Sequence, residues 1–388
     1  MRSRSTPADP AAEDAGGIYV HFPFCRHRCF YCDFNVTTPA RIPGRRYTDA
    51  VIAELAVRAS DLSVPARSLY FGGGTPSLWD PTQVAEVVVA ASRSPGLTFD
   101  AEVTLEANPA DITPQWASDI RAAGVNRLSV GVQALRDPLL RAVDRRHDLA
   151  GALAAVAVVR AAGFLSFSLD FMFGLPGQSS ASWRADLDRV IALGAPHLSV
   201  YNLTVEPPTP LARQVRDGLV KLPADDAQAE MLFGAREALC GAGYGHYEVS
   251  SYALPGHRAV HNSGYWEMRP YLGLGAGAHG FALGRRWSNL RRVPRYVEAA
   301  LQTGRPTDEE ETPDALTLAF DRLMTGLRQL EDGVDITPLG ALWAEHFAEP
   351  AQREIDRGRL TLEGTRLRLT EEGLRWMNPV LVALMPID

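Results

Sequence analysis

Short runs of apolar and β-branched residues alternate along the chain with longer segments in which apolar positions recur at helical spacing. The runs that predict strands are 18–22, 68–71, 102–106, 127–131, 165–171 and 197–203. The helical segments that follow them are 47–58, 81–92, 113–123, 149–162, 181–193 and 224–242. Six successive strand–helix units predict an α/β fold with a parallel sheet, because parallel strands need a crossover connection. The periodicity fits an open, doubly wound sheet and a sheet curved into a partial barrel equally well.

The ends of these helical segments carry matching signals. Glycine follows four of them, at positions where a left-handed residue would end a helix: Gly124, Gly163, Gly194 and Gly243. Thr113 precedes Pro114, and Ser179 or Ser180 precedes another helical segment, so these hydroxyl side chains are predicted N-terminal caps. Residues 17–245 are therefore predicted to form one α/β domain.

The regular alternation ends near residue 243. Residues 245–252 predict one more strand, within a stretch, 246–310, that is otherwise expected to be a loop-rich connection. The rest of the chain predicts helices and one hairpin, with helical spacing from Asp314, a hairpin at 360–370 and a short helix at 371–377. Residues 311–388 are thus expected to be a mainly helical, winged-helix-like accessory domain. No basic stripe marks a recognition helix in it, so nucleic acid is not an expected partner.

Composition limits the location and the partners of the protein. The chain has 388 residues, 46% of them hydrophobic, which is enough for a large domain and a smaller one. Its formal net charge of −7 does not favour a nucleic-acid partner. No run of about 18 apolar residues occurs, so we expect no transmembrane helix and at most a peripheral membrane contact. Residues 1–16 are polar and lack the apolar region of a signal peptide, which predicts a disordered lead-in and a cytoplasmic protein.

A cysteine cluster follows the first predicted strand. Three of the four cysteines have the spacing C-x3-C-x2-C: Cys25, Cys29 and Cys32. In a reducing compartment such a cluster favours a metal site over disulfides, and thiolates favour zinc or an iron–sulfur cluster. A structural zinc ion would need a fourth ligand, for which His21 or His27 is available, whereas three thiolates on a 4Fe–4S cluster leave one iron open. The fourth cysteine, Cys240, lies in an Ala- and Leu-rich helical pattern and is predicted to be a small core residue.

The spacing of the cluster, with the aromatic Tyr31 just before the last cysteine, resembles the radical-SAM signature. The resemblance implies that the open iron is chelated by the amino and carboxylate groups of S-adenosylmethionine. It also implies an electron donor for the cluster, since one electron cleaves the sulfonium to methionine and a 5′-deoxyadenosyl radical. The cofactor carries that chemistry, and the protein places it and excludes water.

Polar and glycine residues lie at the carboxyl ends of successive predicted strands, where parallel α/β folds bind ligands. They are the run Gly72-Gly73-Gly74-Thr75-Pro76, Glu106, Gln133, Arg145 and Asp170. Glycines let backbone N–H groups approach a ligand closely, here the methionine part of adenosylmethionine. Each residue alone is as readily a turn, a cap or a solvated charge, but together on one rim they predict a binding site.

These stretches resemble the radical-SAM coproporphyrinogen oxidase family over most of the chain, from Gly17 to the C-terminus. The positions that match the family's adenosylmethionine site are Tyr19, Gly73, Gly74, Thr75, Glu106, Gln133, Arg145, Asp170 and Thr204, with Ala278 and His279 near the adenine. The last two belong to the segment GLGAGAH at 273–279. The resemblance also implies an incomplete (β/α)6 barrel followed by a helical C-terminal domain.

Two features point to the haem-chaperone branch of that family. The oxidases carry a fourth motif cysteine, and Phe34 occupies its position here. The segment His261-Asn-Ser-Gly-Tyr-Trp266 is similar to a motif of the chaperone branch. A neutral imidazole at His261 is a good axial ligand for haem iron, and Tyr265 and Trp266 suit the porphyrin face or edge. From the residues alone, a loop cap at His261 and Asn262 and a core position for Trp266 are favoured over a haem site, and the resemblance reverses that preference.

The resemblance therefore implies a protein that binds haem, the ligand being His261, and hands it to haem-accepting proteins. Its 4Fe–4S cluster and S-adenosylmethionine would support binding or transfer, and no residue is assigned a catalytic role. Three alternatives remain open from the sequence. They are oxygen-independent oxidative decarboxylation of coproporphyrinogen III propionates, radical chemistry on another substrate, and a structural zinc protein.

Overall fold

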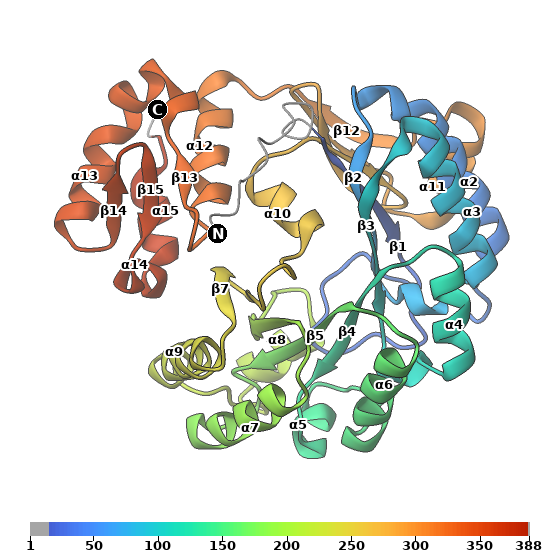
Figure 1. Cartoon of the computed structure of the whole chain (residues 1–388), viewed down its shortest axis with the longest axis horizontal. Coiled ribbons are helices and arrows are strands. Elements are labelled where there is room, and N and C mark those ends of the chain that lie inside the picture. Colours follow the sequence, from blue (N-terminus) through green and yellow to red (C-terminus); the bar gives the residue numbers. More distant parts are fainter. Residues whose placement is uncertain (1–14, 387–388) are drawn as a thin grey trace, which may run out of the picture.

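The structure is a computed structural model that describes residues 15–386. In this part of the chain, a 12-stranded sheet has the order β12-β11-β10-β9-β1-β2-β3-β4-β5-β6-β8-β7. Its centre consists of the predicted parallel strands: β1 (Gly17–Phe22), β2 (Ala66–Gly73), β3 (Leu97–Ala107), β4 (Arg127–Gln133), β5 (Ser166–Phe173) and β6 (His197–Asn202). Figure 1 shows the sheet curved into an open arc, which confirms the partial-barrel alternative.

The helices that connect these strands cover the outer, convex side of the arc (Figure 1). They are α2 (Gly44–Arg58), α3 (Pro81–Ala91), α4 (Pro114–Ala122), α6 (Leu149–Ala161), α7 (Ser180–Ala192) and α9 (Asp225–Gly241). Two shorter helices, α5 (Asp137–Ala142) and α8 (Pro210–Arg216), lie in the connections. The predicted glycine caps have positive φ, from 56° at Gly194 to 99° at Gly124. Thr113 and Ser179 accept backbone N–H groups from the first turns of α4 and α7, as predicted.

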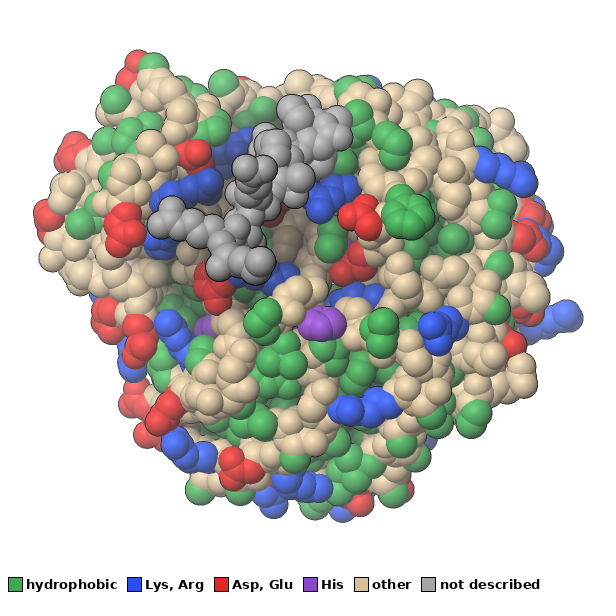
Figure 2. Space-filling model, in the orientation of Figure 1, with side chains coloured by type: hydrophobic (Ala, Val, Ile, Leu, Met, Phe, Trp, Pro, Cys, Tyr) green, Lys and Arg blue, Asp and Glu red, His purple; other side chains and the backbone are tan. Residues whose placement is uncertain are grey.

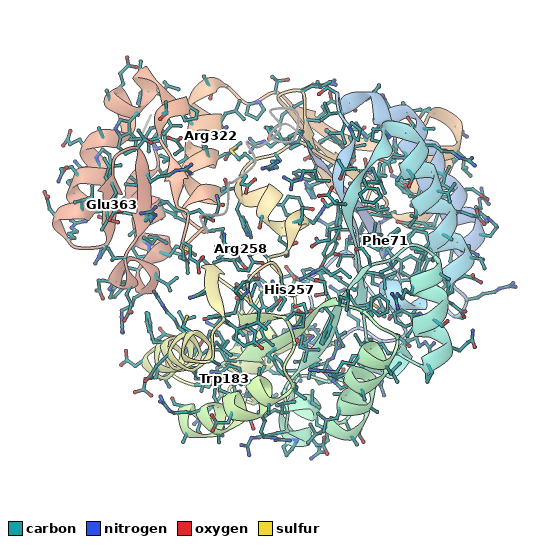
Figure 3. All side chains as sticks on the ribbon, viewed as in Figure 1. Phe71, Trp183, His257, Arg258, Arg322 and Glu363 are labelled. Atoms are coloured by element: carbon teal, nitrogen blue, oxygen red, sulfur yellow. The ribbon has the colours of Figure 1, made fainter. Side chains whose placement is uncertain are left out.

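The alternation of side chains along each strand divides the sheet into an apolar face and a polar face. The residues of β1 that join the core beneath the outer helices are Ile18, Val20 and Phe22. Between two of those helices lies Trp183, labelled in Figure 3, whose indole N–H donates to the carbonyl of Met231 at 3.0 Å. Tyr19 alternates with the core residues of β1 and stacks with Tyr70 of β2. The residues predicted to bind ligands therefore gather on the concave face.

The stretch expected to be rich in loops contains regular elements. Residues 245–252, expected to be one strand, form a hairpin of β7 (Gly245–Glu248) and β8 (Ser251–Ala253). The other elements are α10 (Val260–Trp266), β9 (Tyr271–Leu274), β10 (His279–Ala282), β11 (Arg285–Asn289), α11 (Val293–Thr303) and β12 (Thr307–Glu311). These strands are short, and β9 contains Gly273, where a Cβ would lie 1.7 Å from the carbonyl oxygen of His279. A strand of four residues with a glycine has no apolar alternation to reveal it.

The C-terminal domain lies across the open side of the arc, with its first helix beside α10 (Figure 1). Its elements are α12 (Ala315–Gly326), β13 (Val334–Asp335), α13 (Ala348–Asp356), β14 (Leu360–Glu363), β15 (Arg366–Leu369), α14 (Glu371–Arg375) and α15 (Met377–Leu384). The predicted hairpin is β14–β15, and β13 completes a small sheet. Backbone bonds from Val249 to Arg328 (3.1 Å) and from Leu330 to Tyr247 (3.0 Å) join this domain to the β7–β8 hairpin. The winged-helix-like expectation is thus confirmed.

One core assignment is wrong. Cys240 is exposed near the end of α9, whose buried positions are Met231, Ala235 and Leu239. The Ala-rich composition of this helix did not show which of its sides faces the sheet. Within residues 15–386, no helix is long and apolar enough to cross a membrane.

Candidate functional site

The three motif cysteines lie on the loop that leaves β1. Cys25 is buried and Cys29 and Cys32 are partly exposed, and all three are free thiols. The loop is folded on itself, since the N–H of Cys25 donates to the carbonyl of Thr37 at 2.9 Å and that of Cys32 to the carbonyl of Cys29 at 3.2 Å. Burial raises the pKa of Cys25 to about 11, and the nearby thiols of Cys32 and Cys29 add to the shift. The three sulfur atoms therefore share one electrostatic environment.

Three thiols on one loop match the three-thiolate ligand set of a 4Fe–4S cluster. Among residues 15–386, no group of three or more His, Cys, Asp or Glu side chains is placed to hold one metal ion. The predicted zinc alternative needs four such ligands around one point. In a 4Fe–4S cluster each thiolate binds a different iron at its own corner, so three thiols of one loop suffice and stay further apart. His21 is also committed elsewhere, because its Nε2 lies 2.9 Å from the carbonyl oxygen of Asn35.

A buried cation accompanies the thiols. The guanidinium of Arg145 donates to the sulfur of Cys29 at 3.9 Å and to the carbonyl of Gly131, at the end of β4, at 2.9 Å. Tyr31 lies in the same group, and burial raises the pKa of its phenol to about 12, which keeps it neutral. A cation beside sulfur favours the thiolate form that binds iron. The resemblance had placed Arg145 at the adenosylmethionine site, and here it also contacts the cysteine loop.

The glycine run packs directly under the cysteine loop. A Cβ on Gly74 would lie 2.8 Å from the carbonyl oxygen of Phe24 and 3.0 Å from the sulfur of Cys25. The N–H groups of Gly74 and Thr75 donate to the carbonyls of Phe22 (2.8 Å) and Phe24 (3.0 Å). The hydroxyl of Thr75 donates to the sulfur of Cys25 at 3.3 Å. These N–H groups, which we expected to face a ligand, hold the cysteine loop in place.

Two carboxylates stand on the concave face beyond this loop. Glu106 accepts the hydroxyl of Tyr70 at 2.8 Å and the N–H of Gly73 at 3.2 Å. Burial raises the pKa of Glu106 to about 7, and the nearby charge of Asp170 acts in the same direction. Asp170 accepts hydroxyls from two serines and its pKa is also raised, chiefly by burial. Acceptors of this kind suit the ribose hydroxyls and the ammonium group of adenosylmethionine.

The remaining predicted ligands lie on several different elements. Gln133 ends β4 with a φ of 68°, a left-handed conformation that non-glycine residues rarely adopt. Thr204 is exposed just beyond β6, and His279 is exposed at the first residue of β10. Ala278 is buried beside it, and its N–H donates to the carbonyl of Gly275 at 3.1 Å. The segment 273–279 thus approaches the barrel from the far side of β1.

Two residues that anchor this segment were missed from the sequence. The buried carboxylate of Glu54 in α2 accepts the N–H of Gly275 at 2.9 Å and the hydroxyl of Tyr296 at 2.7 Å. The hydroxyl of Tyr47 accepts the N–H of Ala276 at 2.9 Å. The sequence contained a signal for Glu54, because this acidic residue lies next to Leu55 on the apolar side of a helical pattern. A carboxylate at such a position indicates a buried polar partner.

His261 lies in α10, on the concave face beneath Tyr19 and Tyr70. Its Nδ1 is 2.8 Å from the hydroxyl of Ser68, and its Nε2 is 2.8 Å from the hydroxyl of Tyr265. Its ring stacks on Tyr70 with centroids 5.0 Å apart. Burial lowers the pKa of His261 to about 3, so the imidazole is neutral, the form that binds haem iron. Both ring nitrogens have partners in this arrangement.

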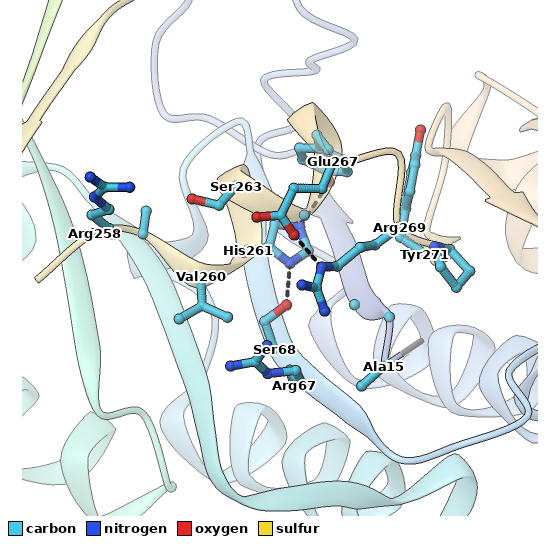
Figure 4. Close-up of a pocket in the computed structure, with 16 residues that line it drawn as sticks. Ala15, Arg67, Ser68, Arg258, Val260, His261, Ser263, Glu267, Arg269 and Tyr271 are labelled. Carbon is cyan, nitrogen blue, oxygen red and sulfur yellow. Dashed lines mark hydrogen bonds and ion pairs between the residues drawn. The ribbon is translucent and has the colours of Figure 1, made fainter. Parts of the chain in front are cut away.

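A cavity of about 160 Å³ adjoins this histidine (Figure 4). Tyr265 lines it together with Arg67, Ser68 and His261. Figure 2 shows a hollow on the same face of the molecule, between the C-terminal domain and the barrel, with basic side chains along its edge. Trp266 points elsewhere, since the guanidinium of Arg328 lies 5.2 Å from the centroid of its ring. Within this motif, His261 and Tyr265 therefore line the cavity, whereas Trp266 contacts the C-terminal domain.

Comparison with known proteins agrees with both halves of the chain. The Radical SAM superfamily matches residues 19–190, and the HemN C-terminal domain matches residues 314–376. A Mycobacterium tuberculosis protein named heme chaperone HemW is 37% identical, with 95% of this chain and 94% of that protein covered. The chain belongs to the HemW family of radical-SAM proteins. A HemW protein from Bacillus subtilis is 34% identical over 87% of each chain.

The chain is also similar to a mitochondrial protein of the mouse, and it shares its fold with an enzyme. Radical S-adenosyl methionine domain-containing protein 1, mitochondrial, from Mus musculus is 34% identical, with 98% of this chain and 89% of that protein covered. The structure of coproporphyrinogen III oxidase (HemN) from Escherichia coli matches with a TM-score of 0.82, covering 96% of this chain and 90% of that one. At 23% identity this match shows a common fold.

Membership of the radical-SAM superfamily implies a 4Fe–4S cluster and S-adenosylmethionine as cofactors. The residues of this HemW-family chain fit both, because three free thiols lie on one loop and two partly buried carboxylates, Glu106 and Asp170, lie beyond it. At the fourth position of the oxidase motif, Phe34 presents an aromatic side chain that is 61% exposed.

Proposed function

We propose that this protein is a haem chaperone, which binds haem and delivers it to haem-requiring proteins while carrying a 4Fe–4S cluster and S-adenosylmethionine. The observation that supports this most strongly is identity of 37% over 95% of the chain to a protein named heme chaperone HemW. The presence of His261 and Tyr265 of α10 at one cavity agrees with that function.

The haem site of this proposal is centred on His261. Its neutral imidazole supplies an axial ligand, once the hydroxyl of Tyr265 releases Nε2. Arg67 lines the same cavity, so its charge is available for a haem propionate. The cavity beside His261 has a volume of about 160 Å³.

The cluster site of the proposal uses the rim of the barrel. Cys25, Cys29 and Cys32 would hold three irons, and the fourth would bind the methionine part of adenosylmethionine. An electron donor would reduce this cluster, which supplies the electron that cleaves adenosylmethionine. The residues proposed to bind adenosylmethionine are Tyr19, Tyr31, Gly73, Gly74, Thr75, Glu106, Gln133, Arg145, Asp170, Thr204, Ala278 and His279. Of these, Gly74 and Thr75 act through the cysteine loop that they support.

In this function the protein would act in the cytoplasm, and any contact with a membrane would be peripheral. A haem-accepting protein would meet it at the open side of the arc, near the cavity that α10 forms with the beginnings of β1 and β2.

An anaerobic absorption experiment tests the proposal. Purified, cluster-loaded protein is titrated with haem, and we expect a shift of the Soret band and transfer of the haem to an apo-haemoprotein. His261→Ala is expected to weaken haem binding by about tenfold or more, in line with the cost of losing a metal-site interaction. Unchanged haem affinity in cluster-loaded H261A protein would remove His261 as the ligand, and no Soret shift in the unaltered protein would remove the function.

The same preparation separates a chaperone from an oxidase. With dithionite, adenosylmethionine and coproporphyrinogen III, we expect no protoporphyrinogen, because Phe34 stands where the oxidases have a cysteine. Formation of protoporphyrinogen at a catalytic rate would favour the enzyme instead.

A further inference from the structure

The beginning of α10 is held by side chains of the barrel. The N–H of Ala259 donates to the hydroxyl of Tyr247 at 3.2 Å. The N–H groups of Val260 and His261 donate to the two carboxylate oxygens of Glu102 at 3.0 and 3.1 Å. These are N–H groups that a helix leaves without partners of its own. The position of α10, and of His261 with it, therefore depends on Tyr247 and Glu102.

Tyr247 is also one end of a buried chain of hydrogen bonds that begins at Asp170. The hydroxyl of Ser168 donates to Asp170 Oδ1 at 2.8 Å and lies 2.8 Å from His197 Nδ1. His197 Nε2 lies 2.8 Å from the hydroxyl of Tyr247. Ser168, His197 and Tyr247 are all at most 3% exposed. The chain thus runs through the interior from the proposed adenosylmethionine site to the first residue before α10.

The directions of these bonds follow from the hydrogens available. Ser168 has one hydroxyl hydrogen and gives it to Asp170, so its oxygen accepts from Nδ1–H of His197 and from the hydroxyl of Ser199, 3.0 Å away. Burial lowers the pKa of His197 well below its usual value, and the neutral ring accepts at Nε2 from the hydroxyl of Tyr247. The oxygen of Tyr247 is then free to accept from Ala259. Every donor in the chain points towards Asp170.

A second connection reaches α10 from the other proposed ligand of adenosylmethionine. Glu106 accepts the hydroxyl of Tyr70 at 2.8 Å, and the ring of Tyr70 stacks on that of His261 with centroids 5.0 Å apart. Glu106 is therefore two contacts from His261 of α10, and Asp170 is four contacts from Ala259, the residue before α10. Chains of buried polar groups with a single consistent direction can carry coupling between sites, and a direct measurement is needed to show it.

We propose that His197 and Tyr247 are positioning residues that couple occupancy of the adenosylmethionine site at Asp170 to the position of α10. A ribose hydroxyl that binds Asp170 competes with Ser168 for the same carboxylate. The orientation of the Ser168 hydroxyl determines which ring nitrogen of His197 carries the hydrogen. That nitrogen in turn determines the orientation of the Tyr247 hydroxyl, and so its hydrogen bond with the N–H of Ala259 before α10. The inference rests on the proposed function in taking Asp170 as an adenosylmethionine ligand and His261 as the haem ligand. Neither His197 nor Tyr247 is itself proposed as a ligand of adenosylmethionine or of haem.

Hydrogen exchange of the α10 amides tests this coupling without relying on activity. Cluster-loaded full-length protein is compared with and without adenosylmethionine, in the absence of reductant so that no cleavage occurs. We expect adenosylmethionine to change the exchange rates at the beginning of α10 by about fivefold or more, the lower end of usual coupling between sites. Tyr247→Phe should abolish this response at Ala259, because the ring still packs on Arg258 while the hydroxyl that joins His197 to Ala259 is gone. A response that reaches His261 through Glu106 and Tyr70 should remain in this variant.

Tyr244→Phe is the matched control. Its hydroxyl is also buried and donates to a backbone carbonyl, that of Ala195, at 2.7 Å, but lies outside the chain from Asp170. Y244F protein should respond to adenosylmethionine as the unaltered protein does. Ser168→Ala cuts the same chain at its other end, and it replaces Y247F if that variant does not fold.

The outcomes are distinct from those of the haem experiment. Loss of the adenosylmethionine response at Ala259 in Y247F or S168A protein, with Y244F unchanged, supports the coupling. An equal response at Ala259 in Y247F and unaltered protein overturns it, as does the absence of any response in the unaltered protein. A haem titration of the same samples is read separately. Failure to bind haem there rejects the proposed function whatever the α10 amides show.

Discussion

The Nε2 atom of His261 lies 2.8 Å from the hydroxyl of Tyr265, one helical turn further along α10. The opposite ring nitrogen is 2.8 Å from the hydroxyl of Ser68. Both nitrogens of the imidazole therefore have hydrogen-bond partners in the absence of haem. Tyr265 occupies the Nε2 atom that would bind iron, and it also lines the cavity. Binding of iron at Nε2 must break the bond to Tyr265, while the bond to Ser68 can remain and orient the ring.

Tyr265→Phe should therefore strengthen haem binding. A neutral hydrogen bond contributes about 1 kcal/mol net, so its removal from the haem-free state should increase affinity roughly fivefold. The measurement is a Soret titration of cluster-loaded protein. Tyr271→Phe is the matched control, since Tyr271 lines the same cavity and packs edge-on against Tyr265 without bonding His261. Weaker haem binding in Y265F than in Y271F would contradict a closing role and favour a direct contact of the hydroxyl with haem.

The parallel half of the fold could be predicted because its signals are local. Each central strand is an apolar run of several residues. Several helices are followed by a glycine with positive φ, such as Gly124 or Gly163, which is a recognisable helix-ending residue. The cysteines and the strand-end residues Glu106 and Asp170 were found for the same reason. They depend on spacing along the chain and on the rule that parallel strands end on one rim.

The other half depends on contacts between distant segments. β9 has four residues including Gly273, and its partner β1 is about 250 residues earlier in the chain, so no local pattern marks it. The bond from Glu54 to Gly275 likewise joins residues 221 positions apart. Cys240 was placed in the core because an Ala-rich helix gives little indication of its buried side. Whether His261 is free or bonded depends on how α10 packs on β2, which only the folded structure shows.

Gly74→Ala tests the contact between the glycine run and the cysteine loop. The new Cβ would meet the carbonyl oxygen of Phe24 at 2.8 Å and the sulfur of Cys25 at 3.0 Å, and backbone cannot rotate away as a side chain can. We expect a loss of about 1–3 kcal/mol in unfolding free energy and a lower iron content after anaerobic reconstitution. Gly234→Ala in α9 is the control, since nothing lies within 4 Å of its Cβ position. That change should raise stability by up to about 1 kcal/mol and leave iron unchanged. Equal iron in the two variants would contradict the packing argument.

Replacement of single cysteines tests which thiols bind the cluster. Alanine at Cys25, Cys29 or Cys32 should abolish the broad visible absorption of the reconstituted protein, because three thiolates are the minimum that the motif provides. The control is Cys240→Ala, which removes an exposed thiol of α9 and should leave the spectrum and the iron content unchanged. Retention of a full cluster in any of the three motif variants would show that another residue of the chain acts as a ligand.

Glu106→Gln should change how stability depends on pH in protein that lacks cluster and adenosylmethionine. Burial raises the pKa of Glu106 from 4.5 to about 7 in the folded state, so folding favours its protonated form. Its contribution to stability is then complete below about pH 4.5 and is lost as the pH rises through 7, an effect on the order of 3 kcal/mol at most. Glutamine does not ionise. The difference in unfolding free energy between the two proteins, measured in urea at pH 5 to 8, should therefore shift in favour of E106Q as the pH rises.

Glu309→Gln on the exposed edge strand β12 is the control and should give a curve parallel to the unaltered protein. A parallel curve for E106Q as well would show that Glu106 keeps its charge in the folded protein, held by Tyr70 and Gly73 alone.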